Sequence, residues 1–81
     1  MKHARSDYDR IQDPAGLIPE NEPVLLFRAQ DKHFIKVARF YQMLVEEDDD
    51  GDMRIVTAID DHLVRARNWP VRKTPDMPRS E

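Results

Sequence analysis

Side chains that can bind an anion flank one short apolar run of the chain, residues 24–27. Guanidinium groups bind carboxylates and phosphates through paired hydrogen bonds, and side-chain amides add neutral donors. Arg28 and Gln30 stand two residues apart, so they would share one face of a strand that continued through them. We therefore predict a binding site for an anionic ligand or partner, to which we assign Arg5, Arg10, Arg28, Gln30 and Lys73.

A structural role for Arg28 is the alternative. Its position just before a predicted helix would add free N–H groups to an anion site, because helix N-termini attract anions. The same guanidinium would also fit an ion pair with Asp31 or with an acid of the N-terminal segment. The sequence leaves both roles open.

The acidic stretch DDDGD, residues 48–52, is tested against a calcium-binding loop. With Asp50 and Gly51 at positions five and six of an EF-hand loop, position one is Glu46 and position twelve is Thr57. Position twelve must supply a bidentate Glu, so the motif fails. A solvated turn is the better interpretation.

Other metal-binding and catalytic signatures are also absent. His3, His33 and His62 have no ligand-like spacing, and the chain has no Cys. Two glycines leave no phosphate-binding loop, and both serines lie near the chain ends. We expect no metal, no cofactor and no enzymatic activity.

The apolar run itself predicts a strand. Residues 24–27 read Val-Leu-Leu-Phe without a polar interruption, which is typical of a strand covered on both faces. Pro23 favours the same interpretation because a residue without an N–H suits the first position of a strand. We predict a turn and one strand over residues 14–31, with Asp31 capping the helix that follows.

Two apolar stripes predict a helical hairpin over residues 32–68. The first helix, residues 32–47, has apolar residues at spacings of three and four. Its stripe contains Phe34, Val37, Ala38, Tyr41, Leu44 and Val45, with Ile35, Phe40 and Met43 beside it. We place the polar residues on the opposite, solvent face, namely Lys32, Lys36, Arg39, Gln42 and Glu46. The stripe predicts a core or a dimer interface rather than a cofactor site.

The second helix is predicted over residues 53–68. Its stripe contains Ile55, Val56, Ile59, Leu63 and Ala66. Acids favour a helix N-terminus and disfavour a C-terminus, so the first helix should end near Glu47 and Asp50 or Asp52 should cap the second. Pro70 stops this helix, and we expect Trp69 to fold back onto the hairpin.

With 81 residues, the chain is predicted to be a single small α+β domain of β-α-α order. Its expected parts are a polar arm (1–13), the turn and strand (14–31), the hairpin (32–68) and an extended tail (69–81). Residues 1–13 would form either a loosely ordered tail or an arm that packs Tyr8 and Ile11.

One strand and two helices leave an open strand edge and more apolar surface than one copy can hide. An isolated strand is not a stable sheet, and an open edge invites pairing. A symmetric homodimer is the simplest closure, so we predict a homo-oligomer.

Charge is unevenly distributed along the chain, although the net charge is only −3. Residues 46–52 carry six acids and no base, whereas residues 62–81 are rich in Arg and Lys. The basic segment with Trp69 raises the alternative of a nucleic-acid accessory protein. No apolar leader or membrane-spanning run is present, so we expect a cytoplasmic protein without a membrane partner.

Three stretches carry a resemblance: MKHAR followed by DYDRIQDPAGLIP, then EPVLLFRAQD, then NWPVRKTPDMP. In these stretches, about half of the chain, the sequence resembles a group of short proteins in phages, prophages and proteobacterial genomes. The resemblance implies an intracellular, phage-associated setting. The group has no assigned activity, so the resemblance transfers no catalytic or binding residue.

Together these features predict a non-enzymatic binding module. We expect an oligomer that engages a host macromolecule or a small anionic ligand, with the nucleic-acid accessory protein as the alternative.

Overall fold

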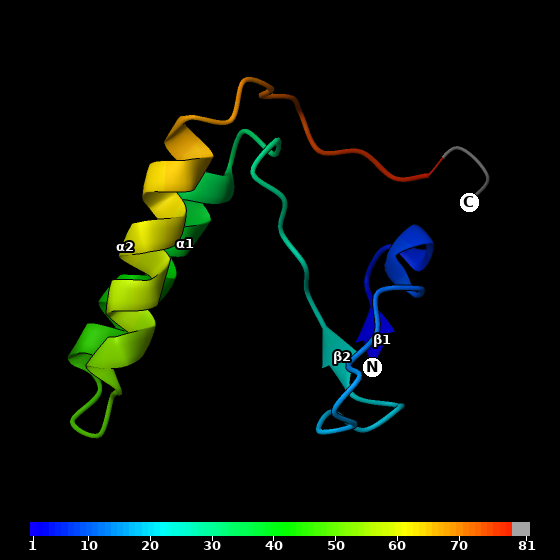
Figure 1. Ribbon diagram of the computed structural model, residues 1–81, viewed down its shortest axis with the longest axis horizontal. Coiled ribbons are helices and arrows are strands. Elements are labelled where there is room, and N and C mark those ends of the chain that lie inside the picture. The colour runs from blue at the N-terminus through cyan, green and yellow to red at the C-terminus, as the bar shows by residue number, and fades with distance from the viewer. Residues whose placement is uncertain (79–81) are drawn as a thin grey trace. The chain divides into compact units, whose positions relative to one another are not determined.

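The computed structural model describes residues 1–78. In it the N-terminal residues pair with the start of the apolar run (Figure 1). Strands β1 (Lys2–His3) and β2 (Pro23–Val24) form a two-stranded parallel sheet. In its register Lys2 lies against Pro23 and His3 against Val24. The N-terminal ammonium group donates hydrogen bonds to the carbonyl oxygens of residues 19 and 20, at 2.6 and 2.7 Å.

The prediction of one unpaired strand is wrong. Regular pairing covers Pro23–Val24 and stops before Leu25, and the partner strand comes from the chain's own N-terminus. Pairing ends at Val24 because β1 contains only two residues, so β1 offers no further backbone groups to residues 25–27. Pro23 does occupy the first strand position, as predicted.

The turn before β2 forms around Asp13. Its carboxylate accepts hydrogen bonds from the backbone N–H groups of Leu17 and Ile18, the latter at 2.7 Å. Gly16 has a φ of +68°, a left-handed conformation that glycine adopts without strain. The predicted turn is therefore confirmed.

Residues 28–75 form a second compact unit, distinct from the unit of residues 1–27 and 76–78. It contains the predicted helical hairpin, with α1 at Phe34–Glu47 and α2 at Met53–Arg67 (Figure 1). The linker keeps the helices close because Gly51 lies against the end of α1. A Cβ atom at Gly51 would come within 2.2 Å of the Val45 carbonyl oxygen.

The charge argument is confirmed for both helices, since α1 ends at Glu47 and α2 is capped by an acid, whereas the predicted N-cap of α1 is wrong. Asp52 is the N-cap of α2 and accepts from the Arg54 backbone N–H at 3.0 Å. The predicted cap of α1, Asp31, lies two residues too early, because the N-cap is His33. Asp31 instead accepts from the His33 N–H at 2.8 Å, so it stabilises the turn leading into α1.

The C-terminal segment is attached to the start of the hairpin. Asp31 and Lys73 form an isolated parallel β-bridge, in which the Lys73 N–H donates to the Gln30 carbonyl at 2.7 Å. Residues 74–78 contain no helix or strand, and the rest of the predicted tail, residues 79–81, lies outside the described residues.

The fully buried part of the hairpin is small. Among residues 1–78, the buried apolar side chains are Val45, Leu63 and Ala66. Trp69, predicted to fold back onto the hairpin, is 51% exposed and is not part of the buried core, and its packing against the helices stays a prediction.

Candidate interaction surface

The apolar face of helix α1 is wider than the part of it that packs against α2. The side of α1 that packs on α2 follows Ala38, Gln42 and Val45, at spacings of four and three. Five large apolar side chains of this helix are exposed between 37% and 59%, namely Val37, Phe40, Tyr41, Met43 and Leu44. The predicted stripe is thus split between the core and the solvent.

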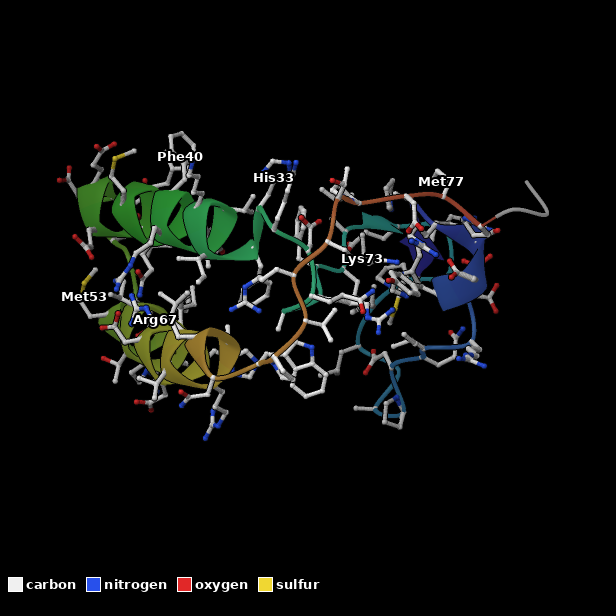
Figure 2. The ribbon with its side chains drawn as sticks, turned by 90° about the horizontal axis from the view of Figure 1, so that it is seen from above. His33, Phe40, Met53, Arg67, Lys73 and Met77 are labelled. Atoms are coloured by element: carbon white, nitrogen blue, oxygen red, sulfur yellow. The ribbon has the colours of Figure 1, made fainter. Side chains whose placement is uncertain are left out.

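The outer face of α1 is formed by Val37, Phe40 and Leu44. These residues recur at spacings of three and four, which places them along one seam of a helix. Phe40 points away from α2, on the same side as His33 at the helix start (Figure 2). We call this seam, together with Tyr41, the α1 outer face.

A shallow groove lies between the helices beside this face. Its volume is about 280 Å³, and it is lined by Phe34, Ala38, Ala58, Ile59 and His62. The lining is largely aliphatic and aromatic, so it extends the exposed apolar surface from α1 onto α2.

A polar network joins the two helices. The Gln42 amide nitrogen donates to the Asp60 carboxylate at 2.8 Å and to the Val56 carbonyl at 2.9 Å. Arg39 donates to Gln42 at 3.0 Å and forms an ion pair with Asp60 at 3.2 Å. The prediction that Gln42 faces solvent is wrong, because α1 is rotated so that its amide enters the helix interface.

The charges of the hairpin separate toward its two ends. The closed end, where the helices are connected, carries the acids Glu46, Glu47, Asp48, Asp49, Asp50 and Asp52. The open end, where α1 starts and α2 stops, carries the bases Lys32, Lys36, Arg65 and Arg67. Within residues 1–78, neither Lys36 nor Glu47 belongs to an ion pair.

Three of the predicted binding residues lie near the open end of the hairpin. Arg28 and Gln30 belong to a turn closed by the hydrogen bond from the Asp31 N–H to the Arg28 carbonyl, at 2.9 Å. They do not share a strand face, because β2 ends at Val24. Lys73 joins Gln30 through the backbone bridge, so the structure brings these two residues together. Their role in ligand binding stays a prediction.

Arg5 and Arg10 belong to the N-terminal unit, where Arg5 has several partners in its own chain. Its guanidinium binds the Asp7 carboxylate at 2.7 and 2.9 Å and the Asp76 carboxylate at 3.0 Å. It also stacks over the Tyr8 ring, 5.0 Å from the ring centre. The hydrogen bonds from Arg5 hold the pKa of Asp7 below its ordinary value of 3.8, and Arg10 adds a smaller electrostatic effect.

The basic C-terminal segment is used in part for helix capping. Arg72 donates hydrogen bonds to the carbonyl oxygens of Ala66, Trp69 and Ala29, at the end of α2 and in the turn before α1. The Ala66 carbonyl lies in the last turn of α2, where acceptors lack intrahelical partners, and it also accepts from the Trp69 N–H at 3.1 Å. No sequence pattern indicates this role, since capping by a distant Arg has no fixed spacing.

No group of three His, Cys, Asp or Glu side chains within residues 1–78 is arranged to hold a metal ion. The same residues contain no helix long and apolar enough to cross a membrane. Comparisons of the chain with protein-family models, curated proteins and solved structures find no match.

Proposed function

We propose that this chain is a non-enzymatic interaction protein that binds a partner protein through the α1 outer face. The observation that carries the proposal is the exposure of Val37, Phe40, Tyr41 and Leu44 in one continuous patch. Exposed apolar patches on small proteins mark binding surfaces, because leaving them in water is unfavourable.

The small core supports the same proposal. Among residues 1–78 three apolar side chains are buried, whereas fifteen large apolar side chains are exposed. Covering one large apolar side chain is worth about 1.5–3 kcal/mol, so a partner on this face would add substantially to a marginal fold.

Photo-cross-linking tests the proposal with a matched control. A photoreactive phenylalanine analogue replaces Phe40 in one variant and Val64 of α2 in another, since their side chains are exposed to 59% and 57%. In the native cell, we expect the position-40 variant to give a discrete adduct with one identified partner, and the position-64 variant none. Equal adduct patterns, or no adduct at position 40, would refute the proposal.

A nucleic-acid accessory role is the second candidate, and the exposed Trp69 beside Arg65 and Arg67 favours it. Proteins bind single-stranded nucleic acid by stacking aromatic side chains on its nucleobases and by holding its phosphates with nearby Arg and Lys side chains. Fluorescence anisotropy with a labelled single-stranded oligonucleotide should then show binding that weakens steeply with salt. Absence of binding at low salt would remove this candidate.

The anionic ligand predicted from Arg28 and Gln30 remains a separate proposal. Replacing Arg28 by Ala separates its two roles. A loss of about 2 kcal/mol or more in unfolding free energy, with unchanged binding of phosphate, would make the role structural.

A further inference from the structure

We propose that the partner on the α1 outer face is a second copy of this chain, packed antiparallel about a two-fold axis near the middle of α1. The inference rests on the proposed function, because it names the occupant of the same surface. Charge complementarity between the two ends of the hairpin is the observation that carries it.

The charges of α1 run against its own macrodipole. A helix is stabilised by acids in its first turn and bases in its last turn. The first turn of α1 has no acid and its last turn has no base. Instead Lys36 lies near the start and Glu46 and Glu47 form the end, so the isolated helix is destabilised by its own charges.

Helix α2 does not compensate for this arrangement. It follows the usual rule, with Asp52 as N-cap and with Arg65 and Arg67 in its last turn. Because the helices form a hairpin, the basic end of α2 lies at the open end with Lys36, and its acidic cap lies at the closed end with Glu47. Each end of the hairpin therefore carries an excess of one sign of charge, although Arg54 pairs with Asp52 at the closed end and Asp31 lies at the open end.

A second copy in the antiparallel direction supplies the missing charges. Its acidic closed end would lie beside the basic open end of the first copy, and the two-fold axis would repeat this contact. A parallel pair would place acid on acid and base on base, which costs free energy at both ends. The charge pattern thus selects one orientation.

The apolar residues of the α1 outer face fit the same two-fold axis. Helix α1 runs from Phe34 to Glu47, so its midpoint lies between Phe40 and Tyr41. An antiparallel pair centred there would place Val37 of each copy against Leu44 of the other, and Phe40 against Tyr41. It would bring Lys36 within about one helical turn of Glu47 of the second copy.

This interface is narrow. A helix of 14 residues is about 21 Å long, and one seam of it buries less than the roughly 800 Å² per partner of a standard interface. We therefore expect a reversible dimer with a Kd on the order of micromolar, weakened by salt because its charged rim is exposed to solvent.

A charge swap tests the inference. Sedimentation velocity measures the dimer Kd of the full chain, of Lys36→Glu, of Glu47→Lys and of the double variant. We expect each single variant to raise Kd by about tenfold, because two attractive rim contacts become repulsive. The double variant restores opposite charges across the axis, so its Kd should return to within about threefold of the original.

Thermal unfolding separates this effect from misfolding. Both single substitutions improve the match of α1 to its macrodipole, so they should keep or raise Tm while they weaken the dimer. A double variant as weak as the single ones, or a dimer Kd that no swap changes, would overturn the inference. A chain that stays monomeric yet cross-links another protein through position 40 would overturn it and leave the proposed function intact.

Discussion

Gln42 is a buried polar residue that connects the two helices by hydrogen bonds. Its amide is 3% exposed, and it connects α1 with both the backbone and a carboxylate of α2. A buried amide of this kind contributes to stability mainly because its removal leaves its partners without hydrogen bonds in a poorly solvated place.

We expect Gln42→Ala to lower the free energy of unfolding by about 2 kcal/mol, since it removes the hydrogen bonds to Val56 and Asp60 and leaves a small void. Chemical denaturation followed by circular dichroism measures the loss. Met43→Ala, on the solvent side of the same helix, serves as control and should change stability by less than about 0.5 kcal/mol. Equal effects of the two variants would show that Gln42 does not hold the hairpin.

Asp7 links the stability of the N-terminal unit to pH. Its pKa in the folded chain lies below 3.8 because of the hydrogen bonds from Arg5. The unfolded chain therefore binds a proton at Asp7 more readily than the folded chain does. The Arg5–Asp7 pair stabilises the folded chain above the ordinary pKa of 3.8, and this stabilisation is lost as the pH falls through the lower pKa of the folded chain.

Denaturation of the full chain between about pH 2 and pH 6 should show stability falling at the acid end, and less so in Asp7→Asn. Asp52, whose pKa Arg54 also lowers, contributes in the same direction, so Asp7→Asn removes only part of the dependence. An unchanged pH dependence in Asp7→Asn would contradict the assignment to the Arg5–Asp7 pair.

At the scale of elements, the cap of α2 distinguishes two neighbouring acids. Asp52→Ala should destabilise the hairpin by about 1 kcal/mol, because it removes the acceptor for the Arg54 N–H. Asp50→Ala, in the same linker, should have little effect or slightly raise stability, since it only removes one charge from a crowded acidic end. Thermal melts of the two variants measure this contrast, and a larger loss at Asp50 would show that the cap is misassigned.

The sequence predicts helices better than it predicts the sheet for a physical reason. The stripes and the acidic linker are local, so the ends of α1 and α2 were predicted within a few residues. The pairing of β1 with β2 joins residues about twenty positions apart through only two residues on each strand. Two residues are too few to show the alternation of apolar and polar side chains that marks a strand, so the sequence pattern could not reveal this pairing.

The candidate surface was predictable only in part. The apolar residues of α1 are visible in the sequence, but which of them α2 covers depends on the rotation of the helix. That rotation buries Gln42, whereas a Gln among apolar residues is expected to face solvent as long as its partners Val56 and Asp60 are unknown. The role of Arg72 was equally hidden, because its acceptors include Ala66 in the last turn of α2 and Ala29 in the turn before α1.

At the scale of the whole molecule, far more large apolar side chains of the described residues are exposed than are buried, and acidic and basic charges are concentrated toward opposite ends of the hairpin. Either property alone is compatible with many partners. Together they favour a partner with an apolar seam and the reverse charge order, and an inverted copy of the same hairpin has both.

Disulfide trapping tests this arrangement most directly, because the chain contains no Cys and single cysteines can be placed freely. Chains with Lys36→Cys are mixed with chains with Glu47→Cys under mild oxidation, with Val64→Cys as a control on α2. We expect the mixed Lys36–Glu47 cross-link to exceed both self-cross-links and the control. Self-cross-links that dominate at each position, or yields no higher than those of Val64→Cys, would contradict the antiparallel dimer.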